Sequence, residues 1–573
     1  MCSLYFVSVG LKRANRKDAV PFESNGKIPQ WSTLPFEILV SILAFASGPP
    51  YYEDFRSNPS NTWLLSAARI CKAFTEPAIT VLYRDPPLWS LERPHGLLET
   101  LKKPMSEKLF AYNVKVKRLQ FDVVRSLAYT SPGRGLFEVA SLIPHIPQIE
   151  EIDIFNSLRT PLLRGAGRHL RWTYSAKLFA ALEENSIYLK SWQWDADLCP
   201  WSHGLSKVDW IANVHTNRAF RSLRKLSLVN FNISNLGLKG RHQLDLDDFS
   251  VCERFSDLPE LRQLVCDSSD LVDEIFLQYV PAGLTHLTLS NCTSLLAESL
   301  RSFLESHGSH LLELHLTHNQ SLNLSFLPGL GKSCSALQVF KVNMNYYKAI
   351  RSLQDSEPVF DELIGVDEVP IWPSSLRTLE MVHLRKWGTE TATMLFTSLI
   401  NAASNLPDLR QLTLKAILNI GWRDRVHFRK EWIGKIEKVF KRIFPEPDPH
   451  LMTMRMFNHW KRKQVTAIDW AHEETSDGDL EITPISKAAV VGRRSLRKRG
   501  AMSTQEEESA ITRERQQNED YETLTIQGMC EVVDVRIDNL RPAESQFTEG
   551  DFLDSDRDED DDGEWNGEDM YSD

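Results

Sequence analysis

The sequence predicts a mixed α/β chain in which a small helical unit precedes a series of strand–helix repeats and a charged tail. Apolar residues recur at helical spacing between residues 34 and 46. Ten short segments between residues 116 and 414 share the frame apolar-x-x-apolar-x-apolar, which is typical of short buried strands. Residues 471–573 are polar and charge-rich, so we expect them to be mostly disordered.

The first helical segment carries two adjacent apolar rows. One row comprises Leu34, Ile38, Ile42 and Phe45, and the other comprises Leu39, Leu43 and Ala46. Pro35 suits the first turn, where its missing N–H group has no intrahelical partner to lose. Because two rows form a wider stripe than one surface helix needs, we expect one row to pack internally and the other to meet a partner.

A second helical stretch follows a connection rich in Pro, Gly and Asn at residues 48–61. It contains Leu64-Leu65, then Cys71-Lys72-Ala73-Phe74, and closes with Leu82-Tyr83-Arg84 before a Pro-Pro pair. The order of these segments after Leu34-Pro35-Phe36-Glu37-Ile38-Leu39 resembles an F-box, over residues 31–88. The connection is longer than is usual in that family. The alternative is a helical hairpin that belongs to the neighbouring core.

The repeats are irregular, since successive frames start 23 to 40 residues apart. Two of them open with the near-copied lead-in Leu-Pro-x-Leu-Arg-Gln-Leu, at residues 258–264 and 406–412. The apolar positions of the ten frames are 116/119/121, 149/152/154, 189/192/194, 223/226/228, 261/264/266, 284/287/289, 311/314/316, 337/340/342, 376/379/381 and 409/412/414.

This frame resembles that of leucine-rich repeats. The resemblance implies a solenoid over residues 110–420, in which short parallel strands stack and helices return on the other side. Such helices are expected at residues 175–184, 271–279, 298–307 and 389–403. The alternative is an ordinary α/β domain with parallel strands.

In each strand the residues between the apolar positions would line an open face. These residues are polar and mixed in charge, which favours protein recognition over phosphate binding, although a plain solvated face is the alternative. The candidates for contact with a partner are Lys225, Ser227, His286, Thr288, Glu313, His315, Lys341, Asn343, Glu380, Gln411, Thr413 and Lys415.

The chain beyond the repeats divides into several segments. Residues 421–470 are expected to form a helical cap, with an amphipathic helix at 426–444 and a Met/Trp cluster at 452–460. Residues 531–538 alternate like a strand, and an isolated strand makes sense only if it docks on the repeats or that cluster. The basic cluster Arg493, Arg494, Arg497, Lys498 and Arg499 predicts a nuclear import signal or a nucleic-acid contact, and the alternative is a solvated linker.

The charge of the chain is concentrated at one end. Residues 551–573 hold twelve acidic residues and one Arg, a net charge of −11 that equals the value for all 573 residues. The remainder is therefore formally neutral, which argues against a nucleic-acid-binding body. Residues 1–30 are polar and basic, and we expect them to be poorly ordered.

Other functional classes find little support in the sequence. Eight cysteines are scattered without paired spacing, so neither a disulfide framework nor a zinc site is predicted. No stretch approaches the roughly 20 apolar residues that a membrane span needs. No catalytic constellation or cofactor motif is present, and we expect a non-catalytic intracellular protein, nuclear or cytoplasmic or both.

An F-box-like unit followed by leucine-rich-like repeats resembles the F-box/leucine-rich-repeat substrate receptors. The resemblance implies that the helices bind the Skp adaptor of an SCF-type (cullin–RING) ubiquitin ligase and that the repeats hold a protein substrate. The alternative is a non-ligase repeat scaffold for protein–protein interaction, for which a nuclear location is one option. Carried over by motif, the adaptor-binding or supporting residues are Leu34, Pro35, Ile38, Leu39, Ile42, Leu64, Leu65, Cys71, Phe74 and Tyr83.

Overall fold

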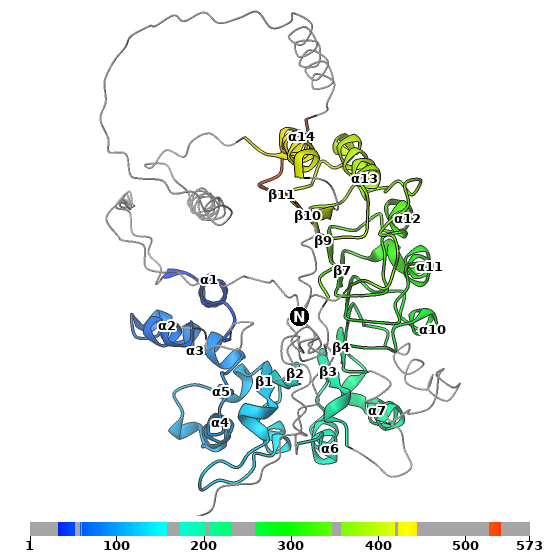
Figure 1. Cartoon of the computed structure of the whole chain (residues 1–573). Helices are drawn as coiled ribbons and strands as arrows, with labels where there is room; N and C mark the ends of the chain where they lie inside the picture. Colours follow the sequence, from blue (N-terminus) through cyan, green and yellow to red (C-terminus); the bar gives the residue numbers. More distant parts are fainter. Residues whose placement is uncertain are drawn as a thin grey trace, which may run out of the picture.

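A computed structural model gives the fold of the chain (Figure 1). It describes residues 33–51, 58, 60–157, 172–200, 207–231, 258–346, 357–418, 422–443 and 526–539. The expected features at 1–30, 452–460, 493–499 and 551–573 lie outside the described residues. None of the described helices is long and apolar enough to cross a membrane.

Three helices form the N-terminal unit: α1 (Phe36–Ser47), α2 (Ser60–Ala67) and α3 (Lys72–Arg84). Pro35 immediately precedes α1, where the lack of an N–H group costs no helical hydrogen bond. Leu43, Leu64 and Ala78 pack together in a small core of the unit's own. α3 ends at Arg84, just before Pro86 and Pro87, which fits the expected end of the helical unit.

The remainder of the described chain is built on an eleven-stranded parallel sheet whose strands follow chain order. Each strand begins two residues after the first apolar residue of its frame, so all ten predicted frames form strands. The strands are β1 (Arg118–Asp122), β2 (Glu151–Phe155), β3 (Ser191–Asp195), β4 (Lys225–Val229), β5 (Gln263–Asp267), β6 (His286–Ser290), β7 (Glu313–Thr317), β8 (Val339–Asn343), β9 (Thr378–Leu384), β10 (Gln411–Leu418) and β11 (Val532–Asn539).

Helices return on the outer side of this sheet, while the strands follow its inner side (Figure 1). The helices after α3 are α4 (Arg93–Lys102), α5 (Tyr112–Lys115), α6 (Ala176–Glu184), α7 (Lys207–His215), α10 (Glu274–Gln278), α11 (Ala297–His307), α12 (Leu327–Ser333), α13 (Thr389–Asn401) and α14 (Trp422–Phe440). Four of them, α6, α10, α11 and α13, fall where the sequence predicts helices. The arrangement resembles a leucine-rich-repeat solenoid.

The apolar residues of each frame form one continuous core between sheet and helices. In β4, for example, Leu223, Leu226 and Leu228 are all buried. This core extends N-terminal of residue 110, because Leu88, Leu97 and Leu101 belong to it. The core therefore begins directly after α3.

A left-handed corner, that is, a residue with a left-handed backbone conformation, follows four of the strands directly and occupies the equivalent position within β9. Asn230, Ser268, Asn291, His318 and His383 each occupy the sixth position counted from the strand start, and each has a φ between 52° and 62°. The corner N–H groups of the first four donate to the last carbonyl of the next strand, at 2.8 to 3.0 Å. The sequence does not predict this device because the five residues share no single type.

The expected strand at 531–538 is β11, which pairs in parallel with β10. Cys530, Val533 and Val535 stand in register with Leu409, Leu412 and Leu414, so residues 526–539 repeat the frame of the preceding unit. The main-chain link is repeated too, since Glu531 N donates to the Arg410 carbonyl at 2.8 Å, just as Arg410 N does to Arg377. β11 is thus the strand of an eleventh repeat.

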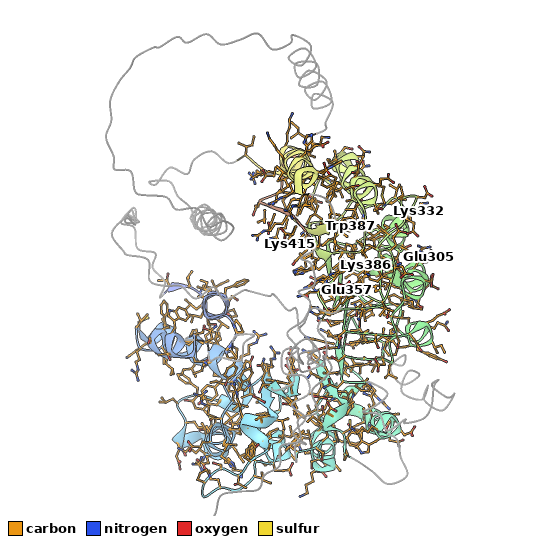
Figure 2. The ribbon with its side chains drawn as sticks, viewed as in Figure 1. Glu305, Lys332, Glu357, Lys386, Trp387 and Lys415 are labelled. Carbon is orange, nitrogen blue, oxygen red and sulfur yellow. The ribbon has the colours of Figure 1, made fainter. Side chains whose placement is uncertain are left out.

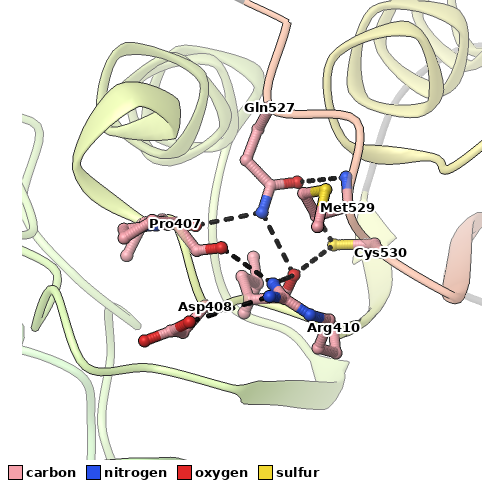
Figure 3. A network of polar contacts seen from close by, with 8 residues as sticks. Pro407, Asp408, Arg410, Gln527, Met529 and Cys530 are labelled. Carbon is pink, nitrogen blue, oxygen red and sulfur yellow. Dashed lines mark hydrogen bonds and ion pairs between the residues drawn. The ribbon is translucent and has the colours of Figure 1, made fainter.

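Side-chain contacts hold the start of this repeat in place (Figure 3). Gln527 Nε2 donates to the carbonyls of Leu406 and Leu409 at 3.0 and 3.1 Å. The thiol of Cys530 lies 3.5 Å from the same Leu409 carbonyl. Gln527 thereby satisfies main-chain groups at the open end of the preceding repeat.

α14 lies beside β11 and covers the end of the stack (Figure 1). Trp432, Ile436, Val439 and Phe440 of this helix are buried, as the amphipathic pattern indicates. The helix begins and ends four residues earlier than expected. Ile443, which the periodicity places on its apolar side, lies beyond the helix and is 94% exposed.

Candidate functional site

The three-helix unit exposes a cluster of large apolar side chains, here called the apolar helix surface. On α1, Ile38, Ile42 and Phe45 recur at a spacing of four and three residues and therefore share one face. Ile38 is 47% exposed and Phe45 is 92% exposed. Further exposed apolar residues of the unit are Phe36, Trp63, Leu65 and Ile70. An exposed apolar cluster of this kind marks an interaction site more often than a solvated surface.

Two of the residues predicted for adaptor binding are interior residues instead. Leu39 is 3% exposed and Leu64 is 4% exposed, so neither side chain is available to a partner. The adjacent apolar rows of α1 look alike in sequence, and only the packing of α2 and α3 decides that Leu39 and Leu43 face inward, while Ala46 of the same row is exposed. The expectation that Leu39 contacts a partner is therefore wrong, and Leu64 supports the unit from within.

The other predicted residues of the unit divide between surface and interior. Pro35, Ile38, Ile42 and Leu65 are exposed, while Leu34, Cys71 and Phe74 are half-buried. Tyr83 is partly buried against the repeat core, and its ring centroid lies 4.4 Å from that of Tyr112. The predicted site residues do not include the exposed Phe36, Phe45, Trp63 and Ile70. The helical spacing from Ile38 and Ile42 points to Phe45, whereas no pattern singles out the other three.

Lys115 connects the three-helix unit to the first repeat. Its Nζ donates to Glu76 Oε1 and Thr80 Oγ1 of α3, both at 2.8 Å, although Lys115 itself belongs to α5. Lys117 N, one residue before β1, donates to the Arg84 carbonyl at the end of α3, at 3.1 Å. The unit therefore covers the start of the sheet while its apolar helix surface stays exposed.

A carboxyl group lies in the same junction. Asp85 follows α3, and its Oδ2 lies 3.8 Å from Arg118 Nη1 of β1 and accepts a hydrogen bond from Gln120 Nε2 at 3.3 Å. Burial raises the pKa of Asp85 to about 7, although the nearby Arg118 acts in the opposite direction. This acid is thus poised to change charge near neutral pH.

The open face of the sheet holds all the predicted contact residues of the repeats. Neighbouring strands are in register, so the first, third and fifth residues of each strand form three rows across the face. All twelve candidates occupy these positions. Ser227 and His315 are buried among their neighbours, whereas Gln411 is exposed and the remaining candidates are half-buried. In Figure 2 Lys415 lies on this inner side, and Glu305 and Lys332 lie on the outer helices.

Ion pairs join β8 to β9 and β10 to β11 on this face, and we call these pairs together the ion-pair ladder. Lys341 Nζ lies 3.4 Å from Glu380 Oε2, and Lys415 Nζ lies 3.6 Å from Asp534 Oδ2. Arg536 Nε is 3.2 Å from the other oxygen of Asp534. At the opposite end of the sheet Arg118 pairs with Asp153 at 2.6 Å. The cations at both ends of the face thus already have carboxylate partners.

Two histidines flank one carboxylate in the middle of the face. His286 Nε2 lies 3.6 Å from Glu313 Oε1, and His315 Nε2 lies 3.7 Å from Glu313 Oε2. Burial, assisted by the charge of Lys341, lowers the pKa of His315. The neutral form of His315 therefore prevails at pH 7.

The described residues contain no group of three or more His, Cys, Asp or Glu side chains placed to hold a metal ion. Their cysteines are free thiols. Burial raises the pKa of Cys334 and of Cys530 to about 12, which suppresses the reactive thiolate form.

Comparison with known proteins adds little to this description. No protein-family model and no curated protein matches the chain. Among solved structures, the chain is similar to an internalin from Listeria monocytogenes. The sequence identity is 14%, the TM-score is 0.28, and the match covers 60% of this chain and 78% of the internalin. The solenoid description therefore rests on the parallel sheet and its repeated frame.

Proposed function

We propose that the chain is a substrate receptor of an SCF-type ubiquitin ligase. The apolar helix surface would bind a Skp-type adaptor, and the open face of the sheet would hold a protein substrate. The receptor itself performs no chemistry in this proposal, since it raises the effective concentration of substrate near a distant active centre.

The apolar helix surface carries this proposal. It lies on the segment whose sequence resembles an F-box, and it keeps Ile38, Ile42 and Phe45 at the surface although the unit has its own core. A helix that only capped the repeats would have no need of three large apolar residues on its outer face. Full burial of one such side chain contributes about 1.5–3 kcal/mol, so several of them suffice to anchor an adaptor.

The test is co-purification of the full chain with a Skp adaptor, wild type against Ile38→Asp/Ile42→Asp. Both residues are on the surface, so the double variant should keep its fold and lose adaptor affinity by about 100-fold. Leu136→Asp is the matched control, because Leu136 is 62% exposed but lies in the first repeat. Wild-type protein that is folded and fails to bind would rule out the ligase function.

A second function has one observation in its favour. Lys115 and Lys117 join the three-helix unit to the first repeat, as expected of a terminal cap on a solenoid. In that case the chain is a repeat scaffold for protein–protein interaction that does not serve a ligase. The co-purification experiment separates the two functions, since only a substrate receptor needs the adaptor.

A further inference from the structure

The charge distribution on the open face of the sheet indicates which kind of protein segment fits there. The face has charged ends, and between them lies a set of uncharged positions bordered by Lys225, Asp267 and the His286–Glu313–His315 group. Arg118, Glu151 and Asp153 occupy β1 and β2, and the ion-pair ladder occupies β8 to β11. The uncharged positions are Gln193, Ser227, Val265 and Thr288 in the third row, with Ser290 and Thr317 in the fifth. We call these six residues the neutral band.

The members of the neutral band are contiguous. Register pairs place Gln193 beside Ser227, Ser227 beside Val265 and Val265 beside Thr288. Ser290 and Thr317 join the same area through hydroxyl groups 2.5 Å apart. Lys225 and Asp267 border the band on opposite sides with opposite charges. Neither sign dominates there.

The cations outside the band are poorly placed to recognise a phosphate. Lys341 and Lys415 sit on different strands, and each pairs with a carboxylate, Glu380 or Asp534. A phosphate group that approached either lysine would be repelled by the carboxylate that pairs with that lysine. Phosphate recognition typically uses clustered Arg side chains that bind in a bidentate manner, and neither these two lysines nor Lys225, a single lysine on β4 at the border of the band, provide this arrangement.

We infer that the open face binds an unphosphorylated protein segment with neutral hydroxyl, amide and aliphatic side chains, docked on the neutral band. Charge complementarity supports this choice, because a charged or phosphorylated side chain docked on the band would lose hydration against uncharged side chains, and Lys225 and Asp267 at its borders together favour neither sign. The inference shares one assumption with the proposed function, namely that the open face binds a protein partner. It does not depend on adaptor binding.

The test uses the full chain and immobilised random peptide pools that differ only in a central block. The block is Thr/Val/Asn, Asp/Glu, phosphoserine or Lys/Arg. We expect the neutral pool to bind at least about tenfold more strongly than the other pools. Its binding should change by less than about twofold between low and high salt, because screening acts on charges.

Three variants test whether the peptides bind at the neutral band. Thr288→Lys introduces a charge into it and should weaken binding of the neutral pool by about tenfold. Thr288→Val keeps shape and neutrality and is the matched control. Lys341→Gln removes a cation of the ladder and should leave binding unchanged. Thermal unfolding of each variant verifies its fold.

Two results would overturn the inference. One is preference for the phosphoserine or acidic pool, which would assign recognition to the ladder if Lys341→Gln abolishes it and to another cation of the face if it does not. The other is binding of every pool at the same level by wild type and Thr288→Lys, including no binding at all. Either result leaves adaptor co-purification unaffected, so failure here is distinct from failure of the proposed function.

Discussion

At the scale of single residues, exposure separates Ile38 from Leu39 although both belong to apolar rows of one helix. Their side chains are 47% and 3% exposed, respectively. Helical spacing predicts both rows, but it carries no information on which row meets α2 and α3. A charge introduced at Leu39 would therefore disturb the interior of the unit. Only substitutions of the outer row test partner binding separately from folding.

Asn291 tests the left-handed corners. Its φ of 52° is tolerated by Asn or Gly but strains a β-branched residue. We expect Asn291→Val to lower the free energy of unfolding by about 1–2 kcal/mol, as measured by urea denaturation. Asn291→Gly loses the same hydrogen bond from Nδ2 to Ser268 Oγ without the strain, and it should stay much closer to wild type. Equal losses in both variants would contradict the strain argument.

Asp85 predicts a pH dependence of stability with a definite sign. Because burial raises its pKa from 3.8 to about 7, the folded state binds a proton more tightly than the unfolded state does. The contribution of Asp85 is therefore fully present below pH 3.8 and is lost as the pH rises through about 7. We expect the stability of Asp85→Asn relative to wild type to increase over this interval in urea titrations. A constant difference would show that the carboxyl group titrates normally.

The cysteines give a prediction about reactivity. Cys71 is half-buried at the start of α3, whereas Cys199, Cys292, Cys334 and Cys530 are buried and burial raises the pKa of each thiol. Brief alkylation of the native protein, followed by peptide mapping, should modify Cys71 and spare these four. Denatured protein serves as the control in which all are modified. Rapid modification of Cys292 in native protein would be inconsistent with the packing of β6.

At the scale of elements, the strands follow closely from the sequence. Ten apolar frames predict ten strands because the apolar positions of each frame identify the residues that face the core. The sequence does not identify the eleventh frame as a repeat. Its apolar positions are Cys530, Val533 and Val535 instead of the usual leucines, and they lie far from the tenth frame along the chain. The alternation at 531–538 nevertheless predicts a docked strand there. Contacts between helices, such as those that bury Leu39, depend on tertiary packing, so the spacing of apolar residues in the sequence does not predict them.

The docking of β11 can be tested by cutting the chain between residues 443 and 526. A protease site introduced there should yield two pieces that co-elute in gel filtration, because hydrogen bonds along β10 and the burial of Ile537 hold β11 in place. Ile537→Asp should release the C-terminal piece, since a buried unpaired carboxylate is costly. Asp538→Ala is the control, as Asp538 is exposed. Separation of the wild-type pieces without denaturant would contradict strong docking.

At the scale of the whole molecule, the two ends of the sheet differ. The start of β1 is bound to α3 through Lys117. Among the described residues no strand pairs with the outer edge of β11. Asp534, Arg536 and Asp538 place charges along that edge, which is a common protection of edge strands against unwanted pairing. The solenoid thus ends in a covered edge and a charged edge.

Removal of those charges should make the protein self-associate. We expect Asp534→Val/Arg536→Val/Asp538→Val to form concentration-dependent oligomers, detectable by light scattering, because the open edge then offers unpaired backbone groups beside apolar side chains. Thr288→Val/Ser290→Val on β6 raises apolarity on an inner strand and should leave the protein in its original state of association. Monodisperse behaviour of the triple variant would mean that the charges of β11 do not protect the edge.

The eleventh repeat also bears on how the gene can change. Lys441, after α14, bridges to Cys530, before β11, so the described residues on the two sides of segment 444–525 lie next to each other. Loop-closure entropy grows only with the logarithm of length, by about 0.6 kcal/mol for each doubling. Evolution can therefore lengthen, shorten or replace residues 444–525 at little cost to the repeats. The same position offers engineers a place to graft a reporter domain within the chain while both ends remain untouched.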